Sequence, residues 1–250
     1  MALLVCKNLT LGYDGNRVIS DLSFAVDSGD YLFIVGDNGS GKSTLMKTIL
    51  KLKTPLSGQI IIGDGLGANE IGYLPQQTIV QKDFPASVRE VVRSGCLSRR
   101  GIRPYYDTEE KQTAEDNMKK LGISDLAKSC YRELSGGQQQ RVLLARALCA
   151  TDNTSAKQKI LLLDEPVAGL DPKASNDMYE LIAKLNKNGT TILMISHDIP
   201  SAVKYASHIL HIDDKSALFF GRVGDYLKSE AGNMYNANKA TEVISDVGND

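Results

Sequence analysis

The segment GDNGSGKST, residues 36–44, constrains the possible folds of this chain more than any other feature. It matches the phosphate-loop pattern G-x-x-x-x-G-K-[ST], follows the apolar run YLFIV (31–35) and opens the helical pattern TLMKTILKL (44–52). A loop in this context turns its backbone N–H groups around a β-phosphate, while its lysine contacts the β- and γ-phosphates and its serine ligates Mg²⁺. Both flanks disfavour a glycine-rich turn that only links a strand to a helix. The predicted nucleoside triphosphate site consists of Gly36, Asn38, Gly39, Ser40, Gly41, Lys42, Ser43 and Thr44.

A second apolar run, KILLLDEP (159–166), carries two carboxylates where the predicted strand ends. Ligands of open α/β sheets bind at the carboxyl ends of the strands, so these carboxylates are expected beside the phosphate loop. Successive side chains on a strand point to opposite sides, so Asp164 is expected to face Mg²⁺ through water and Glu165 to polarise an attacking water. A capping turn before Pro166 is the alternative interpretation of Glu165. We interpret Glu165 as a catalytic base.

Short apolar runs alternate with amphipathic segments along the chain, which indicates the α/β class. The runs YLFIV (31–35), KILLLD (159–164) and TTILMIS (190–196) are apolar on both faces and predict buried parallel strands. Residues before about Asp30 favour short antiparallel strands broken at the turn-rich residues 13–16, whereas residues 87–129 have helical spacing. We therefore expect an α/β core with an N-terminal antiparallel β subdomain and an inserted helical subdomain.

Composition and charge limit the classes of function. The 250 residues allow one or two domains, and 29 basic residues nearly balance 30 acidic ones, which argues against a nucleic-acid partner. The four cysteines are scattered without a CxxC pair, as expected of buried thiols in a reducing compartment. Neither a signal-peptide pattern nor an apolar run near eighteen residues is present, so we expect a cytoplasmic protein that does not itself span a membrane.

The segment ELSGGQQQR (133–141) has the serine and glycines of a phosphate-binding helix start, but neither a lysine nor a preceding strand. Ser135 is placed as an N-cap, and Gly136 and Gly137 lack side chains where a phosphate would approach the helix. Taken alone, the segment is either half of a phosphate site or an ordinary capped helix with a flexible approach.

With GDNGSGKST, LSGGQ and LLLDEP in this order, the chain resembles the ATP-binding subunits of ABC transporters over roughly residues 3–220. The resemblance implies a P-loop NTPase (RecA-like) core that binds ATP and Mg²⁺. It also implies one ATP-binding cassette domain over residues 1–225, with the helical subdomain inserted at about 77–140. The polar segment 226–250 resembles nothing assignable and has the composition of a disordered tail.

Weaker motifs extend this resemblance. Tyr13 matches the aromatic residue that stacks on adenine, and Val18 belongs to the same nucleotide-binding set. Gln76 in YLPQ, Asp171 in AGLD and His197 in ISHD match the Q-loop, D-loop and switch positions of the family. The resemblance thus implies a catalytic set of Glu165, His197 and Gln76, and a Mg²⁺ set of Ser43, Gln76 and Asp164.

The family is built as ATP-driven dimers, and this resolves the ambiguity of ELSGGQQQR. The resemblance implies a head-to-tail dimer of two copies of the chain, in which each ATP lies between Lys42 of one copy and Ser135 of the other. The signature residues that complete the partner's site are Ser135, Gly136, Gly137 and Gln138. The further expected partners are integral-membrane permease subunits, which place this chain peripherally on the inner face of the cell membrane, and, indirectly, an extracytoplasmic solute-binding protein.

The substrate class is suggested by residues 71–95, 131–150 and 164–172, which are most similar to bacterial zinc and manganese importers. Within the first of these, DFPASVREVV (83–92) lies where the helical subdomain of the family receives a short helix of the permease. The alternatives are an importer of another solute, such as iron chelates, or a soluble ABC ATPase not coupled to transport. The soluble alternative is disfavoured because the chain has one cassette, no sustained heptads and no basic excess.

Two further motifs are rejected as functional sites. In LNKNG (185–189), Gly189 occupies the position of the aspartate that would read a guanine base, which argues against a GTPase. In SHILHIDD (207–214), His208 and His211 are three positions apart on a predicted strand, so they should point to opposite faces and should not chelate one ion. The polar insertion TDNTSAKQ (151–158) is expected to be neutral for the chemistry.

Overall fold

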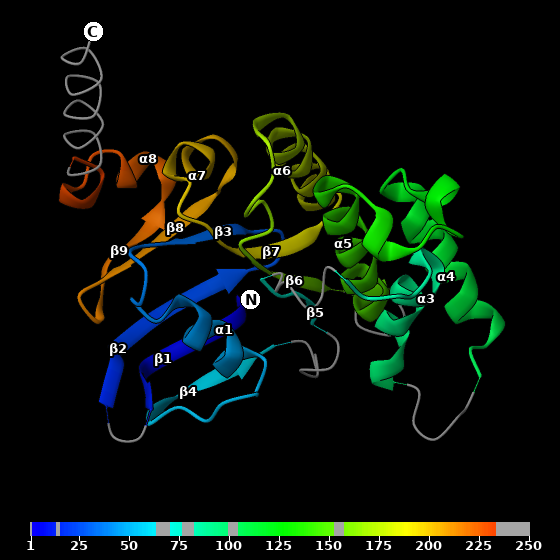
Figure 1. The fold of residues 1–250 in the computed structure, drawn as a ribbon. Helices are drawn as coiled ribbons and strands as arrows, with labels where there is room; N and C mark the ends of the chain where they lie inside the picture. Colours follow the sequence, from blue (N-terminus) through cyan, green and yellow to red (C-terminus); the bar gives the residue numbers. More distant parts are fainter. Residues whose placement is uncertain are drawn as a thin grey trace, which may run out of the picture.

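The computed structural model describes residues 2–13, 16–63, 71–76, 83–99, 105–152 and 158–233. Within these residues the strands form two sheets (Figure 1). The antiparallel sheet has the order β2–β1–β4, and the central sheet has the order β5–β6–β7–β3–β8–β9, with β9 antiparallel to its neighbour. The strands are β1 (Ala2–Tyr13), β2 (Asn16–Asp27), β3 (Tyr31–Val35), β4 (Ser57–Ile62), β5 (Gly72–Leu74), β6 (Lys159–Asp164), β7 (Thr190–Ile195), β8 (His208–Asp213) and β9 (Ser216–Arg222).

The three apolar runs form parallel neighbours in the centre of the larger sheet, as predicted. Every residue of β3 and β7 is buried, and so are five of the six residues of β6, because layers cover both faces of the sheet. The prediction of short N-terminal strands was wrong about their length, since β1 and β2 each run for 12 residues. Their pairing shifts register four times, and such irregularities break the alternation of apolar and polar residues that identifies one long strand.

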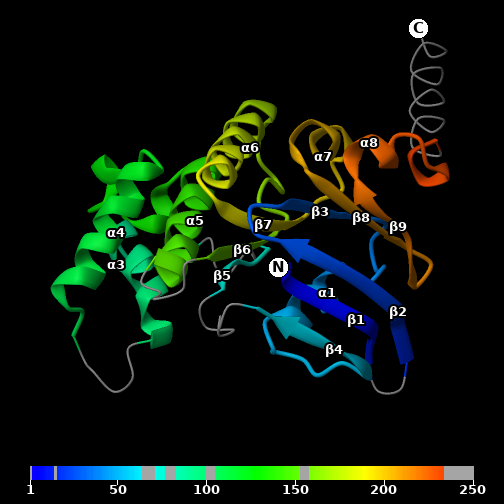
Figure 2. The same ribbon diagram turned by 180° about the vertical axis from the view of Figure 1, so that it is seen from behind.

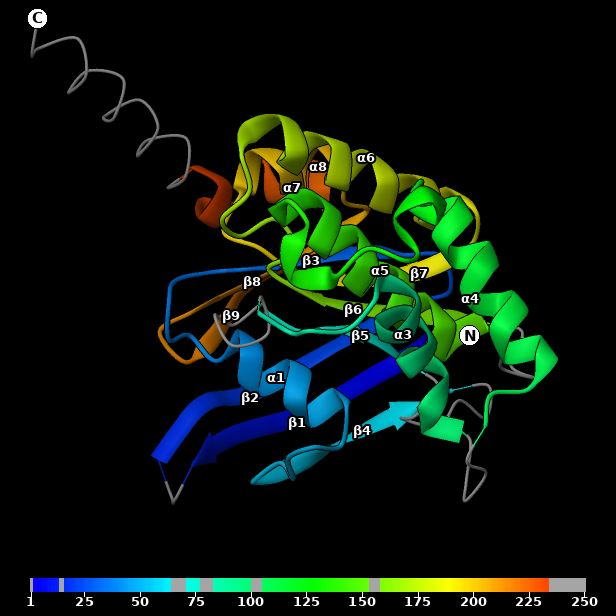
Figure 3. The ribbon, with the colours of Figure 1, turned by 45° about the vertical axis from the view of Figure 1, so that its right-hand side comes forward.

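Helices complete the layers on the two faces of the central sheet (Figure 2). Helix α1 (Lys42–Ile49) fills one core between the antiparallel sheet and the central sheet, through Leu45, Met46 and Ile49. On the other face, helices α5 (Gly136–Asp152), α6 (Pro172–Lys187) and α7 (Ile199–Tyr205) bury their apolar sides in a second core. Figure 3 shows α6 and α7 above the central sheet and the antiparallel sheet below it.

The helical subdomain lies at one end of the central sheet, beside α5 (Figure 1). It contains α3 (Val88–Arg93) and α4 (Thr108–Lys120), with the 3-10 segments η2 (Ser94–Arg99), η3 (Ser124–Leu126) and η4 (Tyr131–Glu133). Both α-helices begin at capping boxes: Ser87 with Glu90 for α3, and Asp107 with Glu110 for α4. These caps are the reason why helices start at DFPASVREVV and at DTEE; residues 77–82 of the predicted subdomain lie outside the described residues.

The predicted start of the polar C-terminal segment, residue 226, lies too early in the chain, because residues after it are still packed against the fold. Tyr226 closes the short helix α8 (Val223–Tyr226) and is completely buried, and Ala231 is only 6% exposed. The Tyr226 hydroxyl contacts His211 Nδ1 at 3.2 Å, which ties this segment to β8. An aromatic residue in an otherwise polar stretch thus anchors the chain through residue 233, while residues 234–250 lie outside the described residues.

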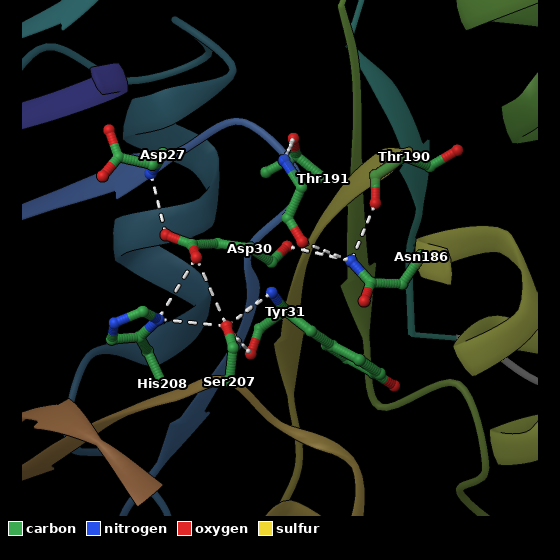
Figure 4. A network of polar contacts seen from close by, with 9 residues as sticks. Asp27, Asp30, Tyr31, Asn186, Thr190, Thr191, Ser207 and His208 are labelled. Atoms are coloured by element: carbon green, nitrogen blue, oxygen red, sulfur yellow. Dashed lines mark hydrogen bonds and ion pairs between the residues drawn. The ribbon is translucent and has the colours of Figure 1, made fainter. Parts of the chain in front are cut away.

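A polar network fixes the amino ends of β3, β7 and β8, opposite the phosphate loop (Figure 4). Asn186, in the last turn of α6, donates from Nδ2 to the carbonyl oxygens of Gly29, Asp30 and Thr190 at 2.9, 3.3 and 3.0 Å. The Asp30 carboxylate lies 3.3 Å from His208 Nδ1 and accepts a hydrogen bond from the Asp27 N–H. Thus His208 lies against Asp30 and His211 against Tyr226, so the two histidines have separate contacts.

A second polar cluster joins three elements at the far end of α5. The Asp152 carboxylate forms ion pairs with Lys120 at the end of α4 and with Lys159 at the start of β6. Burial works to raise the pKa of Asp152, but the hydrogen bonds from Lys159 and Lys120 outweigh it, and the net pKa is lowered. Asp152 belongs to the predicted insertion 151–158, whose residues 153–157 lie outside the described residues.

Within the described residues, no helix combines the length and the apolar composition needed to cross a membrane.

Candidate active site

A polar cavity of about 460 Å³ opens where β3, β6 and β7 end and α1 begins. Its lining brings together residues from segments far apart in the sequence: the end of β1, the start of β2, the phosphate loop with the start of α1, the segment after β5, and the ends of β6 and β7. The lining residues are Tyr13, Val18, Asn38, Gly39, Gly41, Lys42, Ser43, Thr44, Gln76, Glu165 and His197. All of them are residues that the sequence analysis assigned to the nucleotide or to the chemistry.

Two glycines allow the phosphate loop to fold where it does. Gly36 has a φ of +140°, and a Cβ there would lie 1.8 Å from the carbonyl oxygen of Ile212 in β8. Gly41 has a φ of +100°, and its Cβ would lie within 2.8 Å of side-chain carbons of Val18 and Ile19. Side chains at either position would push the loop away from β8 or from β2, so the glycines determine the shape of the cradle.

Lys42 is held inside this loop. Its Nζ donates hydrogen bonds to the carbonyl oxygens of Gly36 and Asp37 at 2.8 and 2.6 Å, and to Ser40 Oγ at 3.4 Å. Burial lowers the pKa of Lys42, while the nearby carboxylates of Glu165, Asp37 and Asp164 act in the opposite direction. The loop therefore presents an ammonium group whose place is already set by the backbone around it.

Asp164, the last residue of β6, offers a carboxylate suited to a divalent cation. The residue is 5% exposed, and its side chain is hydrogen-bonded to Ser43 in the phosphate loop. Its Oδ1 is buried without a hydrogen-bond partner among the described residues. Burial, and next the charge of Glu165, raise the pKa of Asp164. A buried carboxylate oxygen with unused lone pairs beside a serine hydroxyl matches the hard oxygen ligands that Mg²⁺ prefers.

Glu165 contacts the two other residues predicted for the chemistry. Its Oε2 accepts a hydrogen bond from Gln76 Nε2 at 2.9 Å, and its Oε1 lies 3.0 Å from His197 Nε2. Its backbone N–H donates to the Ile195 carbonyl at the end of β7, which fixes the turn after β6. The cavity thus holds a carboxylate that an amide and an imidazole orient from two sides.

The reason for the separation of the two carboxylates differs from the predicted one. We expected strand alternation to turn them apart, but β6 ends at Asp164 and Glu165 already lies outside the strand. Glu165 has a φ of +49°, which is uncommon for a residue with a side chain and is found at strained functional turns. The left-handed turn directs Glu165 toward Gln76 and His197, while Asp164 stays with Ser43.

Tyr13 forms one wall of the cavity and is 45% exposed. Its hydroxyl accepts a hydrogen bond from Thr44 Oγ1 at 3.3 Å. Lys53 Nζ lies 3.1 Å from the centroid of the Tyr13 ring, a cation–π contact that the sequence analysis missed. No local pattern could have found this contact, because Lys53 reaches the ring from the loop after α1.

The signature segment lies at the start of α5 and does not line the cavity of its own chain. Ser135 caps this helix, since Gln138 N donates to Ser135 Oγ at 3.4 Å and Ser135 N donates to Gln138 Oε1 at 3.0 Å. A Cβ at Gly136 would lie 3.2 Å from the Leu170 side chain, so this glycine packs against the turn before α6. Asp171 caps α6 through Oδ1, which accepts from Ala174 N at 2.9 Å. The cap at Ser135 is confirmed, and the role of the segment toward a second copy stays a prediction.

Comparison with known proteins identifies the family. The family described as ABC transporter matches residues 19–168 of the chain, which span the phosphate loop, the signature segment and both carboxylates. The chain belongs to the ABC transporter family. This confirms the predicted resemblance, and membership implies that the chain binds ATP.

Relatives of this ABC protein carry names from metal transport. The chain is 40% identical over 206 residues to a manganese transport system ATP-binding protein of Bacillus subtilis (strain 168), covering 81% of this chain and 80% of the relative. It is 31% identical over 251 residues to a zinc uptake system ATP-binding protein of Listeria innocua, covering 98% of this chain and 93% of the relative.

Comparison with solved structures supports the same family. A solved structure described as an inward-facing conformation of a metal-chelate type ABC transporter superposes with a TM-score of 0.81 at 29% identity, covering 92% of this chain and 87% of that one. The predicted α/β fold with a P-loop NTPase core is therefore confirmed. The individual roles predicted for the site residues stay predictions, which the geometry described above supports.

Proposed function

We propose that this chain is the ATP-binding and ATP-hydrolysing subunit that powers an ABC importer of a divalent metal, zinc or manganese. The observation that carries the ATPase assignment is the single cavity in which Lys42, Glu165 and His197 meet. The assignment to metal import is supported by the relatives named for manganese transport and zinc uptake. An importer of iron chelates is the second candidate, favoured by the likeness to the metal-chelate type transporter.

In this proposal the nucleotide lies along the cavity from Tyr13 to Glu165. The Tyr13 ring stacks on adenine beside Val18, the backbone of the phosphate loop surrounds the phosphates, and Lys42 neutralises charge on the β- and γ-phosphates. Ser43, Asp164 and Gln76 would hold Mg²⁺, and their oxygen donors fit it. When bound, the ion would neutralise charge on the phosphate oxygens.

Glu165 acts as the general base in this proposal. It removes a proton from a water molecule as the water oxygen bonds to the γ-phosphorus, and the bond between that phosphorus and the bridging oxygen of ADP breaks. Gln76 and His197 orient the carboxylate, because each contacts one of its oxygens. The backbone turn at Glu165 keeps it beside the phosphate loop.

A second copy of the chain completes the site in this proposal. Ser135, Gly136, Gly137 and Gln138 lie at the amino end of α5, where helix N–H groups attract anions, yet they do not line the cavity of their own chain. A head-to-tail dimer would bring each signature segment to the partner's γ-phosphate. Asp171, at the start of α6, would meet the partner across the same interface.

The permease contact is proposed at a mainly apolar groove of about 570 Å³ on the helical subdomain. The groove begins at Pro75, next to Gln76, and includes Phe84, whose surface is 56% exposed. Its lining is Pro75, Phe84, Pro85, Ala86, Glu90, Val91, Ser94, Tyr131, Leu143 and Arg146. A short amphipathic helix of an integral-membrane permease fits such a groove. This docking would place the chain at the cytoplasmic face of the membrane, linked through the permease to an extracytoplasmic solute-binding protein.

Metal uptake by cells that lack this chain tests the proposal. Uptake of zinc or manganese should fall, wild-type protein should restore it, and the Glu165→Gln variant should not, whereas iron uptake should stay normal. Normal uptake of zinc and manganese, with loss of iron uptake instead, would move the substrate to the second candidate. Purification of the tagged chain distinguishes a transport subunit from a soluble ABC ATPase. A transport subunit should co-purify with a hydrophobic integral-membrane protein, whereas a soluble ATPase that acts on nucleic acid should co-purify with nucleic acid.

A further inference from the structure

His197 is not fixed by its own packing. Its side chain is 53% exposed, and its Nε2 contacts the Glu165 carboxylate at 3.0 Å. The rotamers open to this imidazole depend on the backbone conformation of its turn, so the turn and the contact with Glu165 together determine where the ring lies. The residues that hold the turn 196–198 therefore decide how well the contact with Glu165 is maintained.

Ser196 stabilises that turn from its buried side. It is 3% exposed, and its Oγ accepts a hydrogen bond from the Asp198 N–H at 3.1 Å, across the backbone of His197. The Ser196 N–H donates to the Ile34 carbonyl, so the turn is also attached to β3 next to the phosphate loop. Asp198 in turn caps α7 through its hydrogen bond from the Ser201 N–H. The Ser196 hydroxyl thus holds the His197 turn together with the backbone hydrogen bond from the Ile199 N–H to the His197 carbonyl at 3.1 Å.

The other partner of this hydroxyl is Tyr179, which lies on α6 and is 2% exposed. The two oxygens are 3.2 Å apart, and the Tyr179 hydroxyl also forms hydrogen bonds with the side chains of Asp198 and Ser201. The Tyr179 ring stacks on Tyr205 of α7, with ring centroids 5.6 Å apart. It also contacts Phe33 of β3, whose ring centroid lies 6.3 Å from that of Tyr179. Burial raises the pKa of Tyr179 to about 12, so the phenol stays protonated at physiological pH. The buried ring is held by these ring contacts, which place its hydroxyl beside Ser196.

We propose that Tyr179 is a positioning residue for ATP hydrolysis, which acts through Ser196 and Asp198, the residues on either side of His197, to hold the His197 turn against Glu165. The proposal rests on the proposed function, since it assigns a support to the imidazole of that same site. The sequence hides this role, because Tyr179 has the spacing of an ordinary core residue on an amphipathic helix. The ring of Tyr179 accounts for its packing in the core, whereas its hydroxyl makes the contact with Ser196 on which the positioning role depends.

Tyr179→Phe tests the proposal, because it removes the hydroxyl and keeps the stacked ring. We expect kcat of the full chain to fall about threefold to tenfold, as the loss of one hydrogen bond that positions a reacting group would produce, with KM for ATP unchanged. Ser196→Ala should have the same effect, and Ser196→Thr, which keeps a hydroxyl, should restore most of the rate. Tyr205→Phe is the matched control: its hydroxyl contacts Glu180 on the surface, so kcat should stay at the wild-type value.

The His197→Ala background separates positioning from general loss of structure. Because Tyr179 acts through His197, Tyr179→Phe should lower kcat no further in that background. The chain has three histidines, so histidine NMR gives a second readout: Tyr179→Phe should shift the His197 Cε1–Hε1 signal and leave those of His208 and His211 in place.

Three outcomes would overturn the proposal. Additive losses in the double variant together with an unmoved His197 signal would reduce Tyr179 to a structural residue. A wild-type kcat in Tyr179→Phe, while His197→Ala is slow, would refute the proposal and leave the proposed function intact. A wild-type kcat in His197→Ala itself would remove the role of His197, and the proposal with it.

Discussion

Glu165→Gln is the substitution with the sharpest expected outcome. It preserves the size of the side chain and replaces one carboxylate oxygen by an amide nitrogen. The glutamine keeps an oxygen that accepts from Gln76 Nε2, and its amide N–H can donate to an Nε2 of His197 that carries no proton, so both contacts at 2.9 and 3.0 Å have a replacement. The free energy of unfolding should therefore change by no more than about 1 kcal/mol. An amide cannot accept the proton of the attacking water, so hydrolysis should slow by a factor of about 10² to 10⁴.

Whereas hydrolysis slows, the affinity of Glu165→Gln for ATP should stay the same or increase. The substitution removes a negative charge from a cavity that also contains the buried carboxylate of Asp164, whose pKa is raised by burial and by Glu165. A neutral residue 165 therefore lowers the pKa of Asp164 and reduces repulsion of the anionic phosphates. We expect the Kd for ATP to be unchanged or lower, and a closed, ATP-loaded dimer to accumulate with Mg²⁺.

The assay is phosphate release at saturating ATP, with ATP affinity and dimer formation measured on the same samples. Glu180→Gln, a carboxylate on the outer surface of α6, is the matched control and should be as active as the wild type. If Glu165→Gln lowered hydrolysis less than tenfold, or if ATP affinity fell in proportion to the rate, the assignment of Glu165 as the general base would be wrong.

Three further predictions test the nucleotide, the dimer and the stability of the chain. Tyr13→Ala should weaken ATP affinity by about 1 to 3 kcal/mol in equilibrium binding, and an unchanged Kd would move the adenine elsewhere. In a Glu165→Gln background, a mixed dimer of one Lys42→Ala chain and one Ser135→Arg chain should occlude one ATP, because both changes meet in one shared site. A chain with both changes, paired with a chain that has neither, should occlude less, and equal occlusion would contradict the head-to-tail arrangement. Asp152→Asn should lower the free energy of unfolding in urea by about 1 to 2 kcal/mol at pH 7. Because the folded pKa of Asp152 is lowered, this difference should disappear as the pH falls below about 4 and through that folded pKa, and a difference that persisted there would refute the ion-pair explanation.

Local patterns were sufficient for much of the fold and of the site. The strand–loop–helix context of GDNGSGKST and the apolar runs before Asp164 and His197 identified the parallel core, because residues buried on both faces leave an unbroken apolar signal. The carboxyl ends of those strands meet at one edge, so the position of the cavity followed from the same reasoning. Gln76 and Tyr13 came from the resemblance to a family.

Other features could not be predicted from the sequence. The length of β1 was hidden by its register shifts, and the packed segment up to residue 233 was hidden by its polar composition. The turn at Glu165 was mistaken for a continuing strand, because its left-handed backbone leaves no mark on the residue types around it. Each of these depends on backbone geometry or on a partner distant in the chain.

The chemistry available to this protein is specified within a few neighbouring residues at a time: a phosphate loop, two carboxylates, an imidazole and a capped helix start. How these groups act on one another follows from the packed structure. It brought Gln76 and His197 to the two oxygens of Glu165, Lys53 to the ring of Tyr13, and the hydroxyl of Tyr179 under the turn of His197. Local patterns cannot specify such contacts, because they join residues up to 89 positions apart and their distances are set by the packing of whole layers.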